Sequence, residues 1–263
     1  MILRKPFALV AMGSLSLFAC GGDSTPSTPA AASKAAPAAE AKPAAPAAAA
    51  GAAGSAAVAG KIAYEGTVAA AEKVKLNADP KCAAMHKDGL ERWQLHVKDG
   101  GLADVLVYVK SGLKGTFPPP AEAALLDQKG CDYHPHMLAM RTGQPLKIRN
   151  SDETLHNIHP RPQVNPEFNL GQARQGMEST RQFDKAEVMI PVGCDVHPWM
   201  RAFISVFDHP FFTVSKEDGT FEIKGLPAGE YEIEAFHGKL KSQAQKVTVK
   251  DGESATLNFT FKG

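Results

Sequence analysis

The sequence lacks a strong charge of either sign and lacks a recognisable catalytic motif. Its 263 residues carry 29 basic and 28 acidic side chains, and no run of Lys and Arg is interleaved with aromatic residues. Nucleic-acid-binding proteins need such a basic surface, so we expect no nucleic-acid partner. No nucleophile–base arrangement and no pair of catalytic carboxylates stands out, so we expect that the chain is not an enzyme.

Helical patterns are scarce as well. Gly and Pro separate many short segments, which is typical of all-β folds, and only 79–86 and 121–126 look helical. Strands are predicted over 60–64, 103–110, 145–150, 181–184, 188–192, 202–207, 220–223, 230–236, 246–250 and 255–261. The last four alternate apolar and polar residues, which indicates sheets with one buried face.

The N-terminal segment has the features of a targeting signal. Arg4 and Lys5 precede an apolar stretch over 7–18, which is too short to span a bilayer core of roughly 30 Å as a helix. Residues 17–20, Leu-Phe-Ala-Cys, resemble the lipobox of bacterial lipoproteins. The resemblance implies a signal peptide over 1–20, lipid attachment at Cys20 and a membrane anchor. The alternative is an ordinary signal peptide with a chance cysteine.

The segment 21–57 is built almost entirely of Ala, Pro, Gly, Ser and Thr. Such side chains bury too little apolar surface to offset the entropy of ordering the chain, and the recurring prolines oppose a helix. We therefore predict a disordered tether. With the lipid anchor, it would hold a folded part away from a membrane of the bacterial cell envelope, in the periplasm or at the outer membrane or cell surface.

The residues most informative about chemistry lie in one short loop predicted after a strand. Cys194, His197 and Met200 follow one another at intervals of three, and His156 stands at the end of an earlier predicted strand. A loop this tight can wrap one ion, and His156 can supply a second imidazole. Two His, one Cys and a weak axial Met are the ligand set of a type 1 (blue) copper site. The sequence therefore predicts one bound copper ion.

Zinc is the main alternative metal. Cys194, His197, His156 and His159 could form a zinc site, because zinc favours nitrogen and thiolate ligands. Zinc does not need a thioether, so Met200 favours copper. A binuclear copper centre would need a second cysteine in the loop, and none is present.

The two ligand segments resemble those of amicyanin-type cupredoxins. They read His-Asn-Ile-His over 156–159 and Cys-Asp-Val-His-Pro-Trp-Met over 194–200, and the likeness extends over about 120–208. It implies a Greek-key β-sandwich in which Asn157 stiffens the ligand loop. The metal ligands that it implies are His156, Cys194, His197 and Met200.

The same resemblance implies how a redox protein partner would approach. In this family the loop histidine, here His197, reaches the surface among apolar side chains. Pro198 and Trp199 would then form a docking patch. The alternative is that Trp199 covers the core.

The other cysteines and histidines have simpler interpretations. Cys82 and Cys131 remain after Cys20 and Cys194 are assigned, and such a pair tends to close as a disulfide in an oxidising compartment. The alternative is a second soft-metal site near Cys131. Five further histidines are predicted to be surface or packed residues: His134, His136, His159, His209 and His237.

The C-terminal part carries a second resemblance. Residues 218–223 and 225–231 look like the non-catalytic carboxypeptidase-regulatory (transthyretin-like) β-sandwich, and segments typical of its first strands stand far upstream, at 60–66 and 102–109. We therefore predict a cupredoxin domain over 117–210 inserted into a sandwich made of 58–116 and 211–263. The alternative is tandem order, with 58–116 part of the cupredoxin.

Two functions are compatible with these features. The first is a one-electron carrier that cycles copper between Cu(I) and Cu(II). The second is a module that holds or senses copper, or binds zinc structurally, without carrying electrons. An exposed edge of His197 would favour the carrier.

Overall fold

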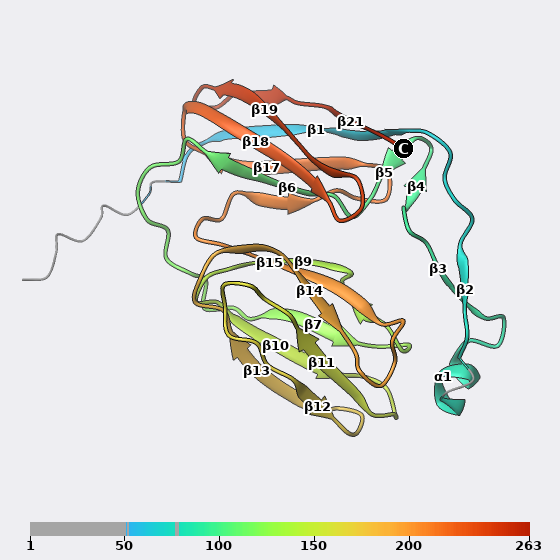
Figure 1. Ribbon diagram of the computed structural model, residues 1–263. Coiled ribbons are helices and arrows are strands. Elements are labelled where there is room, and N and C mark those ends of the chain that lie inside the picture. The colour runs from blue at the N-terminus through green and yellow to red at the C-terminus, as the bar shows by residue number, and fades with distance from the viewer. Residues whose placement is uncertain (1–50, 52, 77–78) are drawn as a thin grey trace, which may run out of the picture. The chain divides into compact units, whose positions relative to one another are not determined.

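The computed structural model describes residues 51, 53–76 and 79–263, and the predicted signal peptide, Cys20 and most of the tether lie outside them. The described part is nearly all β, which confirms the predicted fold class (Figure 1). None of its helices is long and apolar enough to cross a membrane.

The first β-sandwich takes strands from both ends of the described chain. In one sheet, β1 pairs antiparallel with β17 and β5, and parallel with β20 and β21; the other sheet has the order β16-β6-β18-β19. The strands are β1 (Ala56–Glu65), β4 (Val97–Lys98), β5 (Gly101–Leu102), β6 (Leu106–Ser111), β16 (Phe212–Val214), β17 (Thr220–Leu226), β18 (Gly229–His237), β19 (Lys241–Val249), β20 (Ser254–Thr256) and β21 (Phe259–Lys262).

One hydrophobic core joins these strands. Ile62 of β1 and Val107 of β6 are fully buried together with Ile233 of β18 and Phe259 of β21. The alternation that the sequence shows in β17 and β18 places Phe221 in this core. Residues that precede and follow 117–210 in sequence are therefore packed against each other, and neither group alone would bury these side chains.

The second β-sandwich lies between β6 and β16 in the sequence. Its sheets have the orders β13-β10-β7-β8 and β12-β11-β14-β15-β9. The strands are β7 (Ala124–Gln128), β8 (Tyr133–His134), β9 (Met137–Arg141), β10 (Pro145–Asn150), β11 (His156–Pro160), β12 (Leu170–Gln172), β13 (Glu178–Gln182), β14 (Glu187–Gly193) and β15 (Arg201–Phe207). Its core includes Leu126, Ile148 and Ile204, together with Cys194 and Met200.

The helical pattern expected over 121–126 is wrong. Its second half belongs to β7, which pairs in parallel with β10, and Leu126 lies opposite Ile148. Leu126 is fully inaccessible, packed between neighbouring strands rather than on a helix face. Pairing with β10 and burial in the core outweigh the local helical propensity.

The helical pattern over 79–86 is confirmed, and the helix carries one cysteine of a disulfide. Helix α1 (Pro80–Met85) begins after Asp79, whose side chain accepts hydrogen bonds from the backbone amides of Lys81 and Cys82. This is a normal N-cap, with proline in the first turn. Cys82 is bonded to Cys131, with an S–S distance of 2.01 Å. The strands β2 (Glu72–Val74) and β3 (Leu90–Arg92) precede and follow α1 in the sequence, and they pair as a two-stranded antiparallel ribbon.

Candidate metal centre

Three predicted ligands converge in the core of the second sandwich. Nδ1 of His156 lies 2.9 Å from Nδ1 of His197, and Sγ of Cys194 lies 3.8 Å from the latter. The three ligand atoms all lie within 4.8 Å of one another. The exposed fractions of His156, Cys194 and His197 are 0%, 4% and 1%. Two imidazoles and a thiol thus face one small volume that water does not reach.

Strand ends place these side chains. His156 is the first residue of β11, Cys194 follows the last residue of β14, and Met200 immediately precedes β15. The amide of Cys194 donates to the carbonyl oxygen of Met200 (3.3 Å), and the amide of Met200 donates to that of His197 (2.9 Å). Because β14 and β15 pair antiparallel, the loop is closed at its base. Met200 is fully buried in the same core cluster as Cys194.

Asn157 connects the ligand loop to the strand that carries His156. Its Oδ1 accepts a hydrogen bond of 2.7 Å from the amide of Asp195 and lies 3.2 Å from Sγ of Cys194. The amide of His197 also points to that sulfur, at 3.4 Å. The contacts of Asn157 are thus those of a residue that stiffens the loop, because they bridge both ligand segments.

A carboxylate contacts the Nε2 atom of each imidazole, on the side of the ring away from the common volume. Oδ2 of Asp152 lies 2.9 Å from Nε2 of His156, and Oδ2 of Asp79 lies 3.0 Å from Nε2 of His197. With Nε2 engaged, both rings present Nδ1 to the common volume. Carboxylate–histidine pairs of this kind orient the imidazole and raise its basicity toward a metal ion. Neither carboxylate is among the site residues predicted from the sequence.

The sequence contains a pattern that could have identified one of these two carboxylates but not the other. Asp152 stands four residues before His156 in the turn after β10, so a search for acids near the first ligand could have found it. Its carboxylate also accepts hydrogen bonds from the amides of Gly130 and Cys131. Asp79 is 118 residues from its partner His197, and nothing in the linear pattern connects them.

The electrostatics of the site favour a thiolate. Burial alone would raise the pKa of Cys194, but hydrogen bonds with His156 and His197 outweigh it and lower the pKa to about 6. Burial likewise opposes ionisation of Asp152, yet its hydrogen bond with His156 lowers the pKa of the carboxyl group. A deprotonated thiol and oriented imidazoles are the forms that bind a metal ion.

The expectation that His197 reaches the surface is wrong for this chain. Its ring is buried beneath the α1 segment, where Sγ of Cys82 lies 3.6 Å from Nε2 and Asp79 contacts the same nitrogen. The long-range disulfide and the N-cap carboxylate therefore cover the edge that an amicyanin-type site would leave open.

Trp199 lies against the ring of His197 and is partly accessible to solvent. The two ring centroids lie 5.0 Å apart, and Nε1 of Trp199 donates a hydrogen bond of 3.1 Å to the carbonyl oxygen of Cys131. Trp199 is half-buried and packs on the core, whereas Pro198 is exposed. The side chain thus contacts the core and solvent at once.

The alternative ligand sets are not assembled among the described residues. Nδ1 of His159 lies 3.0 Å from a carboxylate oxygen of Asp195, and His159 belongs to none of the metal-capable groups found in this part of the chain. The zinc set that includes it is therefore not formed. Cys131 is oxidised, so it offers no thiolate to a second soft-metal site.

Comparison with known proteins gives one family and several distant structures. The carboxypeptidase regulatory-like domain matches residues 197–262. No curated protein matches the chain in sequence.

Copper proteins are among the similar solved structures. The Cu-containing nitrite reductase (NirK) from Thermus scotoductus SA-01 is 20% identical with a TM-score of 0.31, and the match covers 39% of this chain and 25% of that one. The chain thus spans about a quarter of that enzyme. A reduced amicyanin mutant is 23% identical (TM-score 0.29; 32% and 81% covered). A novel purple cupredoxin from Nitrosopumilus maritimus is 21% identical (TM-score 0.28; 32% and 98% covered).

Proposed function

We propose that this chain is a lipid-anchored copper protein of the bacterial cell envelope that carries single electrons through a type 1 copper site. One observation carries the proposal: two histidine Nδ1 atoms and one cysteine sulfur face each other in a buried volume, with all three atoms within 4.8 Å. Met200 closes the same loop from within the core. Two imidazoles, a thiolate and a thioether are the donor set of type 1 copper.

The donor atoms of these four residues fit a copper ion. His156 and His197 would bind the ion through Nδ1 and Cys194 through its thiolate, and Met200 would supply a weak thioether ligand. A bound copper ion supplies one-electron redox chemistry at such a site. The chain's own residues orient the two rings through Asp152 and Asp79 and exclude water.

The rigidity of the site supports electron transfer. Asn157 bonds the ligand loop to β11, and the loop is closed by its own backbone hydrogen bonds. Ligands held in this way move little when the charge of the ion changes. Trp199 would link the site to a redox protein partner, because it contacts the ring of His197 and also reaches solvent.

The visible spectrum tests the metal assignment. Addition of Cu(II) to the purified metal-free protein should produce the intense thiolate-to-copper charge-transfer band of a type 1 site. Binding of Zn(II) in preference to Cu(II), or a copper adduct without that band, would contradict the proposal and favour the structural zinc alternative.

A second candidate function is copper storage or sensing without electron transfer. The burial of His197 beneath Asp79 and Cys82 favours it, since the ligand edge is closed. Electron self-exchange between the Cu(I) and Cu(II) forms separates the two functions. A carrier exchanges electrons rapidly with no change in copper content, whereas a storage module exchanges them slowly and releases copper to a chelator on reduction.

A further inference from the structure

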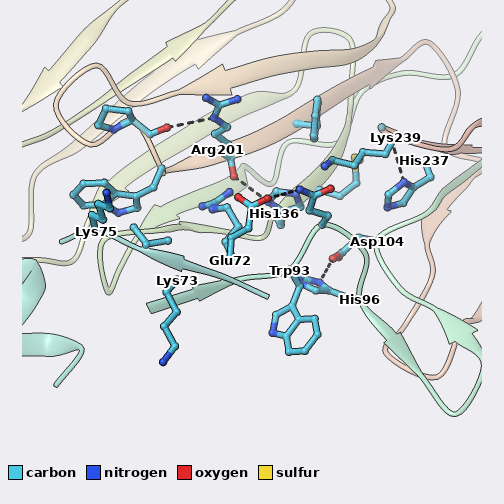
Figure 2. A pocket seen from close by; sticks show the side chains of 18 residues that line it. Glu72, Lys73, Lys75, Trp93, His96, Asp104, His136, Arg201, His237 and Lys239 are labelled. Atoms are coloured by element: carbon cyan, nitrogen blue, oxygen red, sulfur yellow. Dashed lines mark hydrogen bonds and ion pairs between the residues drawn. The ribbon is translucent and has the colours of Figure 1, made fainter. Parts of the chain in front are cut away.

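A cavity of about 690 Å³ borders Trp199. Figure 2 shows this cavity with Trp93, Arg201 and Lys239 labelled among its lining residues. Its walls come from segments far apart in the sequence: the β2–β3 ribbon, the residues before β6, the start of β9, the loop leading into β15, and the turn after β18. A volume of this size is within the range of small-molecule sites. None of the four proposed copper ligands lines it, so a ligand can bind there without a metal ion.

The cavity has an excess of positive charge. Five basic side chains line it, against the acids Glu72 and Asp104: Lys73, Lys75, Arg92, Arg201 and Lys239. Asp104 is already paired with His96 (2.6 Å), and Glu72 accepts a hydrogen bond from Gln94. Asp104 thus has an ionisable partner, whereas Glu72 keeps its negative charge, so the five basic side chains still outnumber the acids.

Several of the basic groups are free to bind an anion. Within the described part of the chain, Lys73, Lys75 and Lys239 form no ion pair, and the only side-chain bond of Arg201 runs from its Nε to the carbonyl oxygen of Pro198 (3.3 Å). Arg92 is paired with Asp132, but its buried Nε has no hydrogen-bond partner. Unpaired cations beside a concave surface attract an anionic ligand.

Aromatic surface lines the same cavity. The chain has two tryptophans, and both Trp93 and Trp199 are lining residues, together with Phe203. Trp93 is 46% exposed, which is high for so large an apolar side chain. Flat aromatic faces next to unpaired cations suit a ligand that combines a ring with a negative charge.

A metal ion suits this cavity less well. His96, His136 and His237 line it with Asp104, but these side chains are not among the groups of the described residues whose ligand atoms lie close enough to hold an ion. The surrounding lysine and arginine side chains would also repel a cation.

We propose that this cavity binds aromatic organic anions, molecules that carry a ring and a carboxylate or sulfonate group. Trp93 and Trp199 contact the ring, and Arg201 and Lys239 bind the negative charge. The proposal holds whether or not the neighbouring centre carries copper. A ligand bound here lies against Trp199, whose ring contacts that of His197, so its binding will also perturb the copper site wherever copper is present.

Intrinsic fluorescence gives a direct test, because both tryptophans of the chain line the cavity. The metal-free full-length protein is titrated with benzenesulfonate, with methanesulfonate (the charge without the ring) and with benzyl alcohol (the ring without the charge). We expect a saturable change in tryptophan emission with benzenesulfonate, and dissociation constants at least about tenfold higher for the other two probes.

Two double variants locate the site. Arg201→Gln with Lys239→Gln should weaken benzenesulfonate binding at least about tenfold, since bonds from charged donors to an anion are strong. Lys246→Gln with Lys250→Gln, which changes two exposed lysines of the first sandwich that do not line the cavity, should leave binding unchanged. The proposal is overturned if benzenesulfonate gives no saturable change, if methanesulfonate or benzyl alcohol binds equally well, or if both double variants bind like the parent protein.

Discussion

The carboxylate of Asp79 lies 3.0 Å from Nε2 of His197, although the two residues are 118 positions apart in the sequence. The same carboxylate caps α1 and accepts a hydrogen bond of 2.7 Å from the hydroxyl of Thr154. Burial alone would raise the pKa of Asp79, but its bonds with Thr154 and His197 lower it to about 2. A charged carboxylate is therefore fixed behind one of the proposed copper ligands at neutral pH.

Replacement of Asp79 tests this relationship. Asp79→Asn should lower copper affinity by about 10–100-fold, because the imidazole of His197 loses the partner that orients it and makes it basic. Competition with a copper chelator measures the affinity. Asp88→Asn, an exposed acid of the same region, is the matched control and should bind copper like the parent protein. Equal affinities of all three proteins would show that Asp79 has no role in metal binding.

Two ligand substitutions should have different effects. Cys194→Ser should abolish the blue colour, since a hydroxyl group is neither soft nor readily ionised. Met200→Leu should keep the colour and raise the reduction potential, because the axial thioether is weak and mainly tunes the site. Visible spectroscopy and redox titration measure both effects. A blue band that persisted in Cys194→Ser would refute the ligand assignment.

The disulfide between Cys82 and Cys131 should stabilise the fold and hold α1 over His197. It joins residues 49 positions apart, so Cys82→Ser with Cys131→Ser should reduce the free energy of unfolding by about 2–4 kcal/mol. Urea unfolding of the metal-free protein measures the loss. Thiol titration of the denatured, metal-free soluble part, which lacks Cys20, should find Cys194 reactive and this pair unreactive. Reaction of all three thiols would contradict the disulfide.

His237 should make the protein acid-sensitive. Burial lowers the pKa of its imidazole from 6.5 to about 4, so the folded state holds the ring neutral while the unfolded state protonates it. The contribution of neutral His237 to the free energy of unfolding is complete above pH 6.5 and is lost as the pH falls toward 4. Thermal unfolding over this range should show a smaller loss in His237→Gln than in the parent protein. His134→Gln, which changes an exposed ring, should show the same loss as the parent protein. Identical pH profiles of thermal unfolding for all three proteins would exclude His237 as the source of the acid sensitivity.

The first sandwich should fold without the second. Strands β6 and β16 are paired, with Tyr108 opposite Phe212, so the chain leaves and re-enters this sandwich at adjacent positions. Replacement of 117–210 by a short Gly-Ser linker, in a Cys82→Ser background that avoids an unpaired thiol, should give a soluble β protein that unfolds cooperatively and binds no copper. An unfolded product alongside a stably folded 58–210 fragment would instead support tandem order.

Local sequence patterns were sufficient for part of the strands and for one half of the metal centre. The alternation over 230–236 predicts β18, because each side chain of a strand points to one face and only one face is buried. The spacing of Cys194, His197 and Met200 predicts that one loop brings them together. A seven-residue loop leaves few other arrangements once its ends are joined by a strand pair.

Only the tertiary structure decided what surrounds these ligands. The burial of His197, the two carboxylates behind the imidazoles and the cavity beside Trp199 all depend on contacts between segments far apart in the sequence. The segment over 121–126 became a strand for the same reason, since its partner β10 lies elsewhere in the chain. Periodicity and spacing report on neighbours along the chain, whereas burial and hydrogen bonding depend on which distant segments meet in the fold.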